Sequence, residues 1–274
     1  MNKVIFITGA SKGFGKLWAE ALLKQGDKVI ATARNTNALQ DLVATYGDAI
    51  LPLQLDVNNR QEVFDTVEKA AKHFGKIDVL ISNAGYGLFG TTEETNEAEA
   101  RQQMETNFFG SLWVAQAVLP IFRKQKSGHL IQISSFLGLT TIPMLGLYNA
   151  SKFAVEGLME TIASETAHLG IKTTLIEPNG FSTDWAGASA AQTSAGIQDY
   201  DVIRKGFGEI GANADNWGNP EATIQPVLNL VNNPNPPLRL LFGKVAYHGM
   251  VQVYNKRLQE VEDWKEVSLA AHGH

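Results

Sequence analysis

A tyrosine and a lysine lie four residues apart in the segment Tyr-Asn-Ala-Ser-Lys, at positions 148 and 152. Residues at this spacing share one face of a helix, and the apolar periodicity predicts a helix over residues 147–169. An ammonium group near a phenol stabilises the phenolate and lowers the phenol pKa. Tyr148 and Lys152 therefore predict a general acid or base, although incidental helical pairs of this kind are common.

Other polar residues that could contact a ligand follow the ends of predicted strands. Ser135 could donate a hydrogen bond to a substrate oxygen, or it could simply cap a turn. Asp56 closes another strand, where a helix-capping role is the alternative. The small residues Asn83, Ala84 and Gly85 would let the backbone pass close to a cofactor. Asn107 falls inside a long predicted helix, where an amide is unfavourable unless it stabilises a local distortion or binds water.

The segment from Thr8 to Gly15, Thr-Gly-Ala-Ser-Lys-Gly-Phe-Gly, lies between a predicted strand and a predicted helix. A dinucleotide-binding turn requires this context. Gly9 would permit the tight turn, Gly13 the close approach of a pyrophosphate, and Gly15 the close packing of helix on strand. Ser11, Lys12 and Phe14 complete the loop, and the helix N-terminus would offer free N–H groups to phosphates. A structural turn that merely favours glycine is the alternative.

The end of the second predicted strand indicates which dinucleotide would bind. NAD-binding folds place an acidic residue there to accept from the ribose 2′-hydroxyl, but this chain has Ala33 followed by Arg34. Together with Lys12, Arg34 supplies positive charge for a 2′-phosphate. The sequence thus favours NADP over NAD, unless both cations are ordinary surface charges.

The spacing of short apolar segments predicts the elements that position these residues. Strands are expected from Lys3, Lys28, Ala49, Lys76, His129, Ile171 and Leu238. Helices are expected at 13–25, 36–46, 60–73, 97–122, 147–169 and 220–231, with a terminal helix after residue 243. Most of the strands are continuously apolar, as in parallel sheets covered on both faces. The alternation predicts an α/β fold: a Rossmann-type doubly wound parallel sheet of about seven strands.

The same pattern predicts one dinucleotide-binding and catalytic domain over residues 1–265. The Gly-rich segment 186–219 has weak periodicity, and so long a connection is typical of a substrate lid. Residues 266–274 are expected to be a flexible tail.

Composition excludes several classes of protein. The 274-residue chain has no cysteine, which excludes disulfides and zinc–thiolate sites, and its net charge of −5 argues against nucleic-acid binding. No apolar segment reaches the ~20 residues that span a bilayer, so a cytoplasmic protein without membrane contact is expected. The six histidines show no metal-ligand spacing, so no metal is expected.

Seven of these motifs, in this order and spacing over residues 1–185, resemble the short-chain dehydrogenase/reductase family. They are the glycine segment, Asp56, the Asn83 segment, Asn107, Ser135, Tyr148–Lys152 and the segment from Glu177 to Trp185. The finer pattern is similar to hydroxysteroid-dehydrogenase-like bacterial members. One departure is Asn179, which follows Pro178 where the family usually has glycine. Asparagine tolerates left-handed geometry moderately well, so the loop is expected to survive.

The resemblance implies a role for each matching residue. Tyr148 would be the catalytic acid or base, Lys152 would hold the nicotinamide ribose and lower the Tyr148 pKa, and Ser135 would orient the substrate carbonyl. Asn107 would support a proton-relay water. The remaining cofactor contacts would be Asp56 and Val57 at the adenine, Asn83, Ala84 and Gly85 at the ribose, and Pro178, Phe181 and Thr183 at the carboxamide.

The expected activity is NADPH-dependent hydride transfer that interconverts a ketone or aldehyde with an alcohol. A homodimer or homotetramer built through helices 97–122 and 147–169 is expected from the resemblance. Two alternatives are a catalytically idle NADP-binding sensor or scaffold, which would not need Ser135, Tyr148 and Lys152, and an epimerase or dehydratase on a longer related fold. Trp185, Phe181 and Trp217 could line an apolar substrate pocket or pack in the core.

Overall fold

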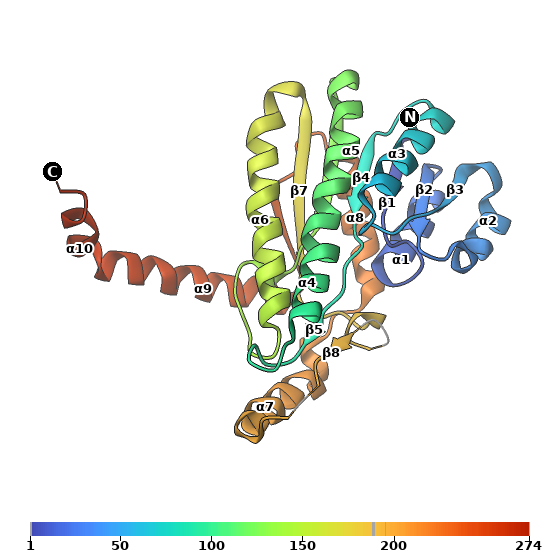
Figure 1. The fold of residues 1–274 in the computed structure, drawn as a ribbon. Helices are drawn as coiled ribbons and strands as arrows, with labels where there is room; N and C mark the ends of the chain where they lie inside the picture. The colour runs from blue at the N-terminus through green and yellow to red at the C-terminus, as the bar shows by residue number, and fades with distance from the viewer. Residues whose placement is uncertain (1, 188–189, 195, 274) are drawn as a thin grey trace.

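A twisted sheet of seven parallel strands forms the centre of the molecule (Figure 1). The computed structural model describes residues 2–187, 190–194 and 196–273. The strand order is β3-β2-β1-β4-β6-β7-β9. The strands are β1 (Val4–Ile7), β2 (Lys28–Ala33), β3 (Ile50–Gln54), β4 (Val79–Ser82), β6 (Gly128–Ile133), β7 (Ile171–Pro178) and β9 (Arg239–Phe242). All seven predicted strands are confirmed, and the chain is a single doubly wound α/β domain.

Helices cover both faces of this sheet and make two apolar layers. One layer packs α1 (Gly13–Lys24), α2 (Gln40–Tyr46) and α8 (Ile224–Asn232) on the sheet. The other packs α3 (Arg60–Phe74), α5 (Gly110–Gln125) and α6 (Gly146–Thr166). Alternate residues of a strand point to opposite faces, and β1 shows this directly. Its Ile5 and Ile7 enter the first layer, while Val4 and Phe6 enter the second.

The order of the strands reverses next to β1, because β3 and β4 lie on opposite sides of it. In an open α/β sheet the ligand site lies outside the carboxyl ends of the strands at such a switch point. The loops that follow β1 and β4 meet at this point. The topology therefore brings the glycine segment and the Asn83 segment together.

The predicted helix over 97–122 is interrupted at the position of Asn107. The chain forms α4 (Glu97–Met104), one π-helical turn over Glu105–Phe109, and then α5. A π turn inserts one extra residue into the helical ladder and is frequent at functional sites. The expected local distortion at Asn107 is confirmed.

Two parts of the chain extend beyond the sheet and its helices. Residues 186–219 contain α7 (Asp201–Ala212), which sequence periodicity did not predict, and β8 (Ala191–Gln192), which pairs with β5 (Leu88–Phe89). Residues 188, 189 and 195 of the predicted lid lie outside the described residues. The terminal helix is α9 (Lys244–Asp263), followed by α10 (Lys265–Ala270) in the predicted tail, and it projects away from the body (Figure 1). Within the described residues, no helix is long and apolar enough to cross a membrane.

Candidate active site

A cavity of about 1170 Å³ lies over the carboxyl ends of the strands, between the body and the lid segment. Most of the predicted site residues line it. They are Gly9, Ser11, Lys12, Gly13, Phe14, Arg34, Asp56, Val57, Asn83, Ala84, Gly85, Ser135, Tyr148, Lys152, Pro178, Phe181 and Thr183. Gly15 and Asn107 are the two predicted residues that do not line it, and each lies directly behind its wall.

The backbone of the loop after β1 requires its glycines, through positive φ at Gly9 and Gly13 and through close approach at Gly15. Gly9 has φ +67° and Gly13 has φ +54°, a region that favours glycine. A Cβ at position 15 would lie 2.3 Å from the carbonyl oxygen of Gly9. Gly15 therefore lets α1 start close against β1, so that the amino end of α1 faces the cavity.

Hydrogen bonds lock the loop after β4 onto the loop after β1. The Thr8 hydroxyl accepts from the backbone N–H groups of Asn83 and Ala84 at 2.9 and 3.0 Å. The Asn83 amide donates to the carbonyls of Thr8 and Gly9 at 3.0 and 3.1 Å. The side chain of Asn83 therefore shapes the floor of the cavity, and its small neighbours keep that floor open.

Two cations and no carboxylate stand at the end of β2. Ala33 is buried, and the exposed residues Arg34 and Lys12 both line the cavity. Neither forms an ion pair with any residue that the structure describes. Asp56, at the neighbouring strand end, accepts from the N–H of Asn58 at 3.0 Å and so stabilises a turn. The helix-capping role considered as its alternative belongs to Asn59, the N-cap of α3.

Ser135, Tyr148 and Lys152 lie close together in the wall of the cavity. All three are buried, with 5%, 4% and 6% of their surface exposed. The Lys152 ammonium donates to the carbonyl of Ile133 at 2.9 Å and lies 5.7 Å from the centre of the Tyr148 ring. Burial lowers the pKa of Lys152 to about 8, and the nearby carboxylate of Glu156 opposes this shift. The predicted juxtaposition of the phenol and the ammonium is therefore present.

The expectation that Lys152 lowers the pKa of Tyr148 is wrong for this structure. Burial raises the pKa of the Tyr148 phenol well above its usual value, and a hydrogen bond with Ser135 opposes the rise only in part. Loss of solvation penalises the phenolate more than its neighbours stabilise it. The Tyr148 hydroxyl therefore keeps its proton in this conformation.

Asn107 supports the wall from behind. Its amide oxygen accepts from the N–H of Tyr86 at 3.1 Å, and its amide nitrogen donates to the Tyr86 carbonyl and the Ser151 hydroxyl, each at 3.0 Å. These contacts tie the π turn to the loop after β4 and to α6. A Cβ at Gly85 would lie 3.1 Å from the Asn107 amide oxygen and 3.8 Å from the Lys152 nitrogen, which places Asn107 next to the lysine.

Aromatic side chains cover Tyr148 on the side of the lid segment. The ring of Trp185 lies 5.0 Å from that of Tyr148 and 5.3 Å from that of Phe89, and Phe207 of α7 lies 6.0 Å from Phe89. Of the two alternatives for Trp185, lining an apolar pocket or packing in the core, the structure favours the pocket. Phe181 also lines the cavity, yet it is 7% exposed and packs edge-on to Phe14 at 5.2 Å, so it serves the core as well.

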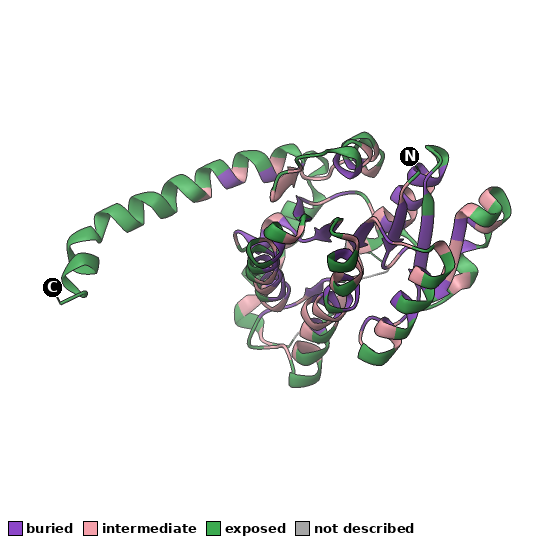
Figure 2. Ribbon diagram, turned by 90° about the horizontal axis from the view of Figure 1, so that it is seen from above, coloured by how far each residue is buried: buried purple, intermediate pink, exposed green. Residues whose placement is uncertain are grey.

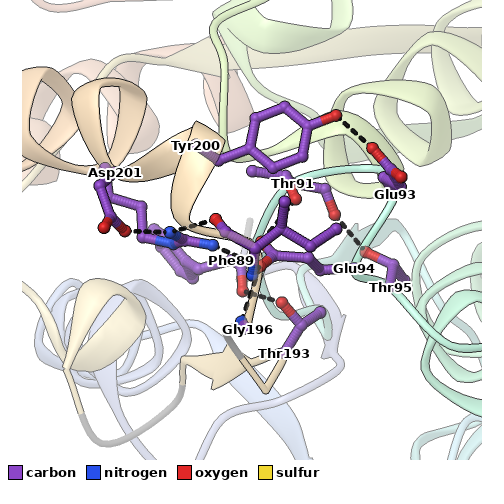
Figure 3. A network of polar contacts seen from close by, with 11 residues as sticks. Phe89, Thr91, Glu93, Glu94, Thr95, Thr193, Gly196, Tyr200 and Asp201 are labelled. Carbon is purple, nitrogen blue, oxygen red and sulfur yellow. Dashed lines mark hydrogen bonds and ion pairs between the residues drawn. The ribbon is translucent and has the colours of Figure 1, made fainter.

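The lid segment is fastened to the body at Glu94, which follows β5 (Figure 3). The Glu94 carboxylate accepts from the N–H groups of Gly196 and Ile197, each at 2.8 Å, and from the Thr91 hydroxyl at 2.6 Å. It also pairs with Arg204 of α7. These hydrogen bonds, first that of Thr91, lower the pKa of Glu94 from 4.5 to about 2.

Replacing Glu94 by glutamine should loosen the lid segment. The variant loses the charge that holds Arg204, so the amides of Gly196 and Ile197 should exchange hydrogen faster than in the wild type. Because the pKa of Glu94 is depressed, its contribution is present above about 4.5 and is lost as pH falls toward about 2. Glu97→Gln, on the nearby surface of α4, is the control and should leave this exchange unchanged. Equal protection in both variants would exclude a fastening role.

Asn179 performs a different task from the one expected. Its φ is not positive, so left-handed geometry is not needed. Instead its amide oxygen accepts from the N–H of Ala246 at 3.3 Å, and its amide nitrogen donates to the Gly180 carbonyl at 2.7 Å. Asn179 therefore connects the loop after β7 to the first turn of α9.

Sequence reasoning missed a buried acidic pair behind the lysine. Glu156 of α6 and Glu177 of β7 are 4% and 0% exposed, and the Arg239 guanidinium lies 3.1 and 3.5 Å from them. Burial raises the pKa of both carboxyls. Glu156 follows Lys152 by four residues and so shares its helix face, a spacing that could have drawn attention to it.

Comparison with known proteins identifies the family. Residues 3–194 match the model of the short chain dehydrogenase family. The chain is 39% identical to Oxidoreductase BOA17 of Botryotinia fuckeliana, over 99% of this chain and 100% of that protein. It is 37% identical to a 3-ketodihydrosphingosine reductase of Bacteroides thetaiotaomicron, over 89% of each chain.

Solved structures agree with this assignment. A short-chain dehydrogenase from Streptomyces avermitilis superposes with a TM-score of 0.92 at 33% identity, covering 98% of this chain and 99% of that one. An alcohol dehydrogenase from Thermococcus sibiricus, solved with 5-hydroxy-NADP, superposes with a TM-score of 0.74 at 25% identity, covering 90% of this chain and 98% of that one. The chain belongs to the short-chain dehydrogenase/reductase family of oxidoreductases.

Proposed function

We propose that this protein is an NADPH-dependent carbonyl reductase that interconverts a ketone or aldehyde with an alcohol. The observation that carries the proposal is the convergence of Ser135, Tyr148 and Lys152 in the cavity that the glycine loop also lines. A hydride carrier and a proton donor would then flank one carbonyl group. A member of the family that acts as an idle sensor would have no use for a buried proton donor at this place.

The cavity fits a dinucleotide on its own geometry. The loop after β1 has no side chain at Gly9 or Gly13, and the amino end of α1 offers free N–H groups to a pyrophosphate. Asp56 and Val57, which line the cavity, would contact the adenine, and Asn83, Ala84 and Gly85 would border a ribose. Pro178, Phe181 and Thr183 would approach the carboxamide. The nicotinamide, when bound, supplies the hydride.

The protein's own groups would handle the substrate oxygen. The Ser135 hydroxyl, which already accepts from the N–H of Leu137 at 3.1 Å, would donate to the carbonyl oxygen and orient it. The Tyr148 hydroxyl would give that oxygen its proton. The Lys152 ammonium would stabilise the phenolate left behind, and Asn107 would hold the wall and a relay water in place.

Arg34 and Lys12 favour NADPH over NADH. The 2′-phosphate carries close to two negative charges at neutral pH, by analogy with phosphomonoesters whose second pKa is ~6. Arg34 can meet it with a planar fork, and Lys12 can add a compact charge. The alcohol dehydrogenase from Thermococcus sibiricus, solved with an NADP derivative, supports this choice.

The substrate half of the cavity is suited to a bulky apolar carbonyl compound. Phe89, Phe136, Ile142, Trp185 and Phe207 line it. A relative named as a 3-ketodihydrosphingosine reductase has, by that name, a ketone as substrate. Because Trp185 covers Tyr148 in this conformation, we expect the lid segment 186–219 to move when a substrate enters. A dimer or tetramer through the faces of α4, α5 and α6 is the expected assembly.

The direct test is NADPH oxidation, followed by absorbance, with a panel of ketones and aldehydes that differ in apolar bulk. Turnover that rises with apolar bulk supports the proposal. Binding of NADPH without oxidation by any carbonyl compound, seen as a thermal shift alone, would favour the idle sensor. Activity confined to sugar nucleotides would favour the epimerase alternative.

The reduction rate should fall as pH rises through about 8. The pKa of Lys152 is lowered to about 8, so its ammonium is present below that pH and is lost above it. Once the ammonium is lost the phenolate has no countercharge, and the rate should drop by up to about tenfold per pH unit. Lys152→Arg keeps a permanent charge. Any reduction rate that this variant retains should therefore not fall as the pH rises through about 8. The same fall in both proteins would assign it to another group.

A further inference from the structure

The terminal helix α9 stands outside the body as an arm. It contains 20 residues, which at 1.5 Å per residue makes it about 30 Å long. Its buried residues are Ala246 and Met250, both close to its start. Figure 1 shows the helix projecting from the domain and continuing into α10, and Figure 2 shows that most of its residues after Met250 are exposed.

A single stripe of large apolar side chains follows this exposed helix. Its members are Tyr247, Val251, Tyr254, Leu258 and Val261, with 59%, 48%, 42%, 67% and 69% of their surface exposed. Their spacing is 4, 3, 4 and 3 residues, which repeats every seven residues. A narrow stripe with this repeat matches the seam of a coiled coil, whereas a helix that packs on a globular core has a wider apolar face.

Because each of these five side chains is at least 42% exposed, no other part of the chain that the structure describes covers the stripe. Isolated helices of this length are marginal in water unless an apolar face is packed, and large contiguous exposed apolar surfaces mark interaction sites. A second helix with the same seven-residue repeat would bury this stripe. A second copy of this chain supplies one.

We propose that two copies of this chain pair through their arms as a parallel two-stranded coiled coil. If Val251 and Leu258 occupy the first core position of each heptad, Tyr247, Tyr254 and Val261 occupy the second. Arg257 then flanks the core on one side and Glu262 on the other. These two residues are five apart, the spacing at which charged residues of parallel helices pair between strands.

The charges distinguish parallel from antiparallel pairing. In a parallel pair, Arg257 of each arm faces Glu262 of the other, which gives two ion pairs related by the twofold axis. In an antiparallel pair, the side of one helix that carries Arg257 faces the same side of the other helix, so positive charges lie near each other. The side that carries Glu262 likewise faces the Glu262 side of the partner. Arg257 forms no ion pair with a residue that the structure describes, and Glu262 pairs within its own arm with exposed Lys265 at 3.1 Å.

The charge balance also argues against a lipid surface as the partner. From Lys244 to Ala270 the basic residues are Lys244, Lys256, Arg257 and Lys265, and the acidic residues are Glu260, Glu262, Asp263 and Glu266. Helices that lie on membranes are typically rich in lysine and arginine on their polar face. This arm has no net positive charge to attract anionic lipids.

Charge reversal tests the pairing. Arg257→Glu and Glu262→Arg should each weaken association by about tenfold or more, because each places like charges opposite one another. The double variant R257E/E262R should restore it. Lys256→Glu changes the same charge on the far side of the helix and is the matched control. Sedimentation velocity at micromolar concentration should show a halved mass for the two single variants only. Turnover in the carbonyl reductase assay, or NADPH binding, reports that the domain remains folded.

Cross-linking tests the direction, and the absence of cysteine from the natural chain makes it clean. Tyr247→Cys and Val261→Cys should each form a disulfide-linked dimer with itself under mild oxidation. If the arms were antiparallel, neither variant alone would form the disulfide. A disulfide-linked dimer would then appear only when the two variants are mixed. Single variants with the wild-type mass, or a double variant that stays dissociated, would overturn the proposal. So would retention of the protein on anionic vesicles that is lost in Leu258→Asp while the mass is unchanged.

Discussion

Replacing Tyr148 by phenylalanine should lower kcat for ketone reduction by about 10²–10⁴, the usual cost of a lost general acid. The substitution removes the hydroxyl that we propose as the proton donor, and it keeps the ring that packs against Trp185 at 5.0 Å. NADPH affinity should change little, because the hydroxyl is not needed to fill the dinucleotide half of the cavity. Steady-state kinetics and NADPH titration of the same preparation measure both quantities.

The control is Tyr46→Phe, which removes a hydroxyl from α2 outside the cavity. Its kcat should match that of the wild type. Should Tyr148→Phe keep more than about a tenth of wild-type turnover, the assignment of Tyr148 as proton donor is wrong.

The second large effect concerns the choice of cofactor. Wild-type kcat/KM should favour NADPH over NADH by about two orders of magnitude, because two charge-assisted contacts to the 2′-phosphate act only on NADPH. Ala33→Asp combined with Arg34→Ala should reverse the preference. The new carboxylate can accept from a free 2′-hydroxyl and repels a phosphate. Arg34 and Lys12 are exposed, so the preference should also shrink as salt rises and screens charges over ~10 Å at 0.1 M.

Lys24→Ala is the matched control, since it removes a cation at the far end of α1. Its cofactor preference should equal that of the wild type. A wild-type ratio near one would show that Arg34 and Lys12 are ordinary surface charges.

The sheet, and the meeting of the candidate site residues at one cavity, were predictable because each depends on local pattern. A buried parallel strand is a short apolar segment, and β1 and β2 show this over Val4–Ile7 and Lys28–Ala33. The glycine loop, Ser135 and the Tyr148–Lys152 pair lie at the ends of such strands or on one helix face. The parallel topology then brings them to one edge of the sheet.

Helix α7 was not predicted, because its sequence opposes its structure. It contains Gly206, Gly208 and Gly211, and glycine lowers helix stability by about 1 kcal/mol relative to alanine at each position. The helix depends instead on contacts from outside it. Phe207 packs near Phe89, and Arg204 pairs with Glu94, 110 residues away in the chain. The spacing of residues within α7 gives no information about contacts with such distant parts of the chain.

The environment of Tyr148 was predicted only in part for the same reason. The spacing to Lys152 is local, and it is present. The cover provided by Trp185 and the buried Glu156–Glu177 pair depend on how distant segments pack, and they determine the solvation of the site. That packing is why burial raises the pKa of Tyr148, although the adjacent lysine alone would lower it.

Transfer of deuterium from labelled NADPH to a ketone tests the central claim most directly. NADPH carrying deuterium at C4 of the nicotinamide ring, prepared separately with each of the two stereochemical labels, is incubated with a bulky apolar ketone. We predict that one label, and not the other, appears at the carbinol carbon of the alcohol, detected by mass spectrometry, and that Tyr148→Phe suppresses its formation. Bound NADPH with no deuterium in any alcohol product would contradict the assignment of this protein as a carbonyl reductase.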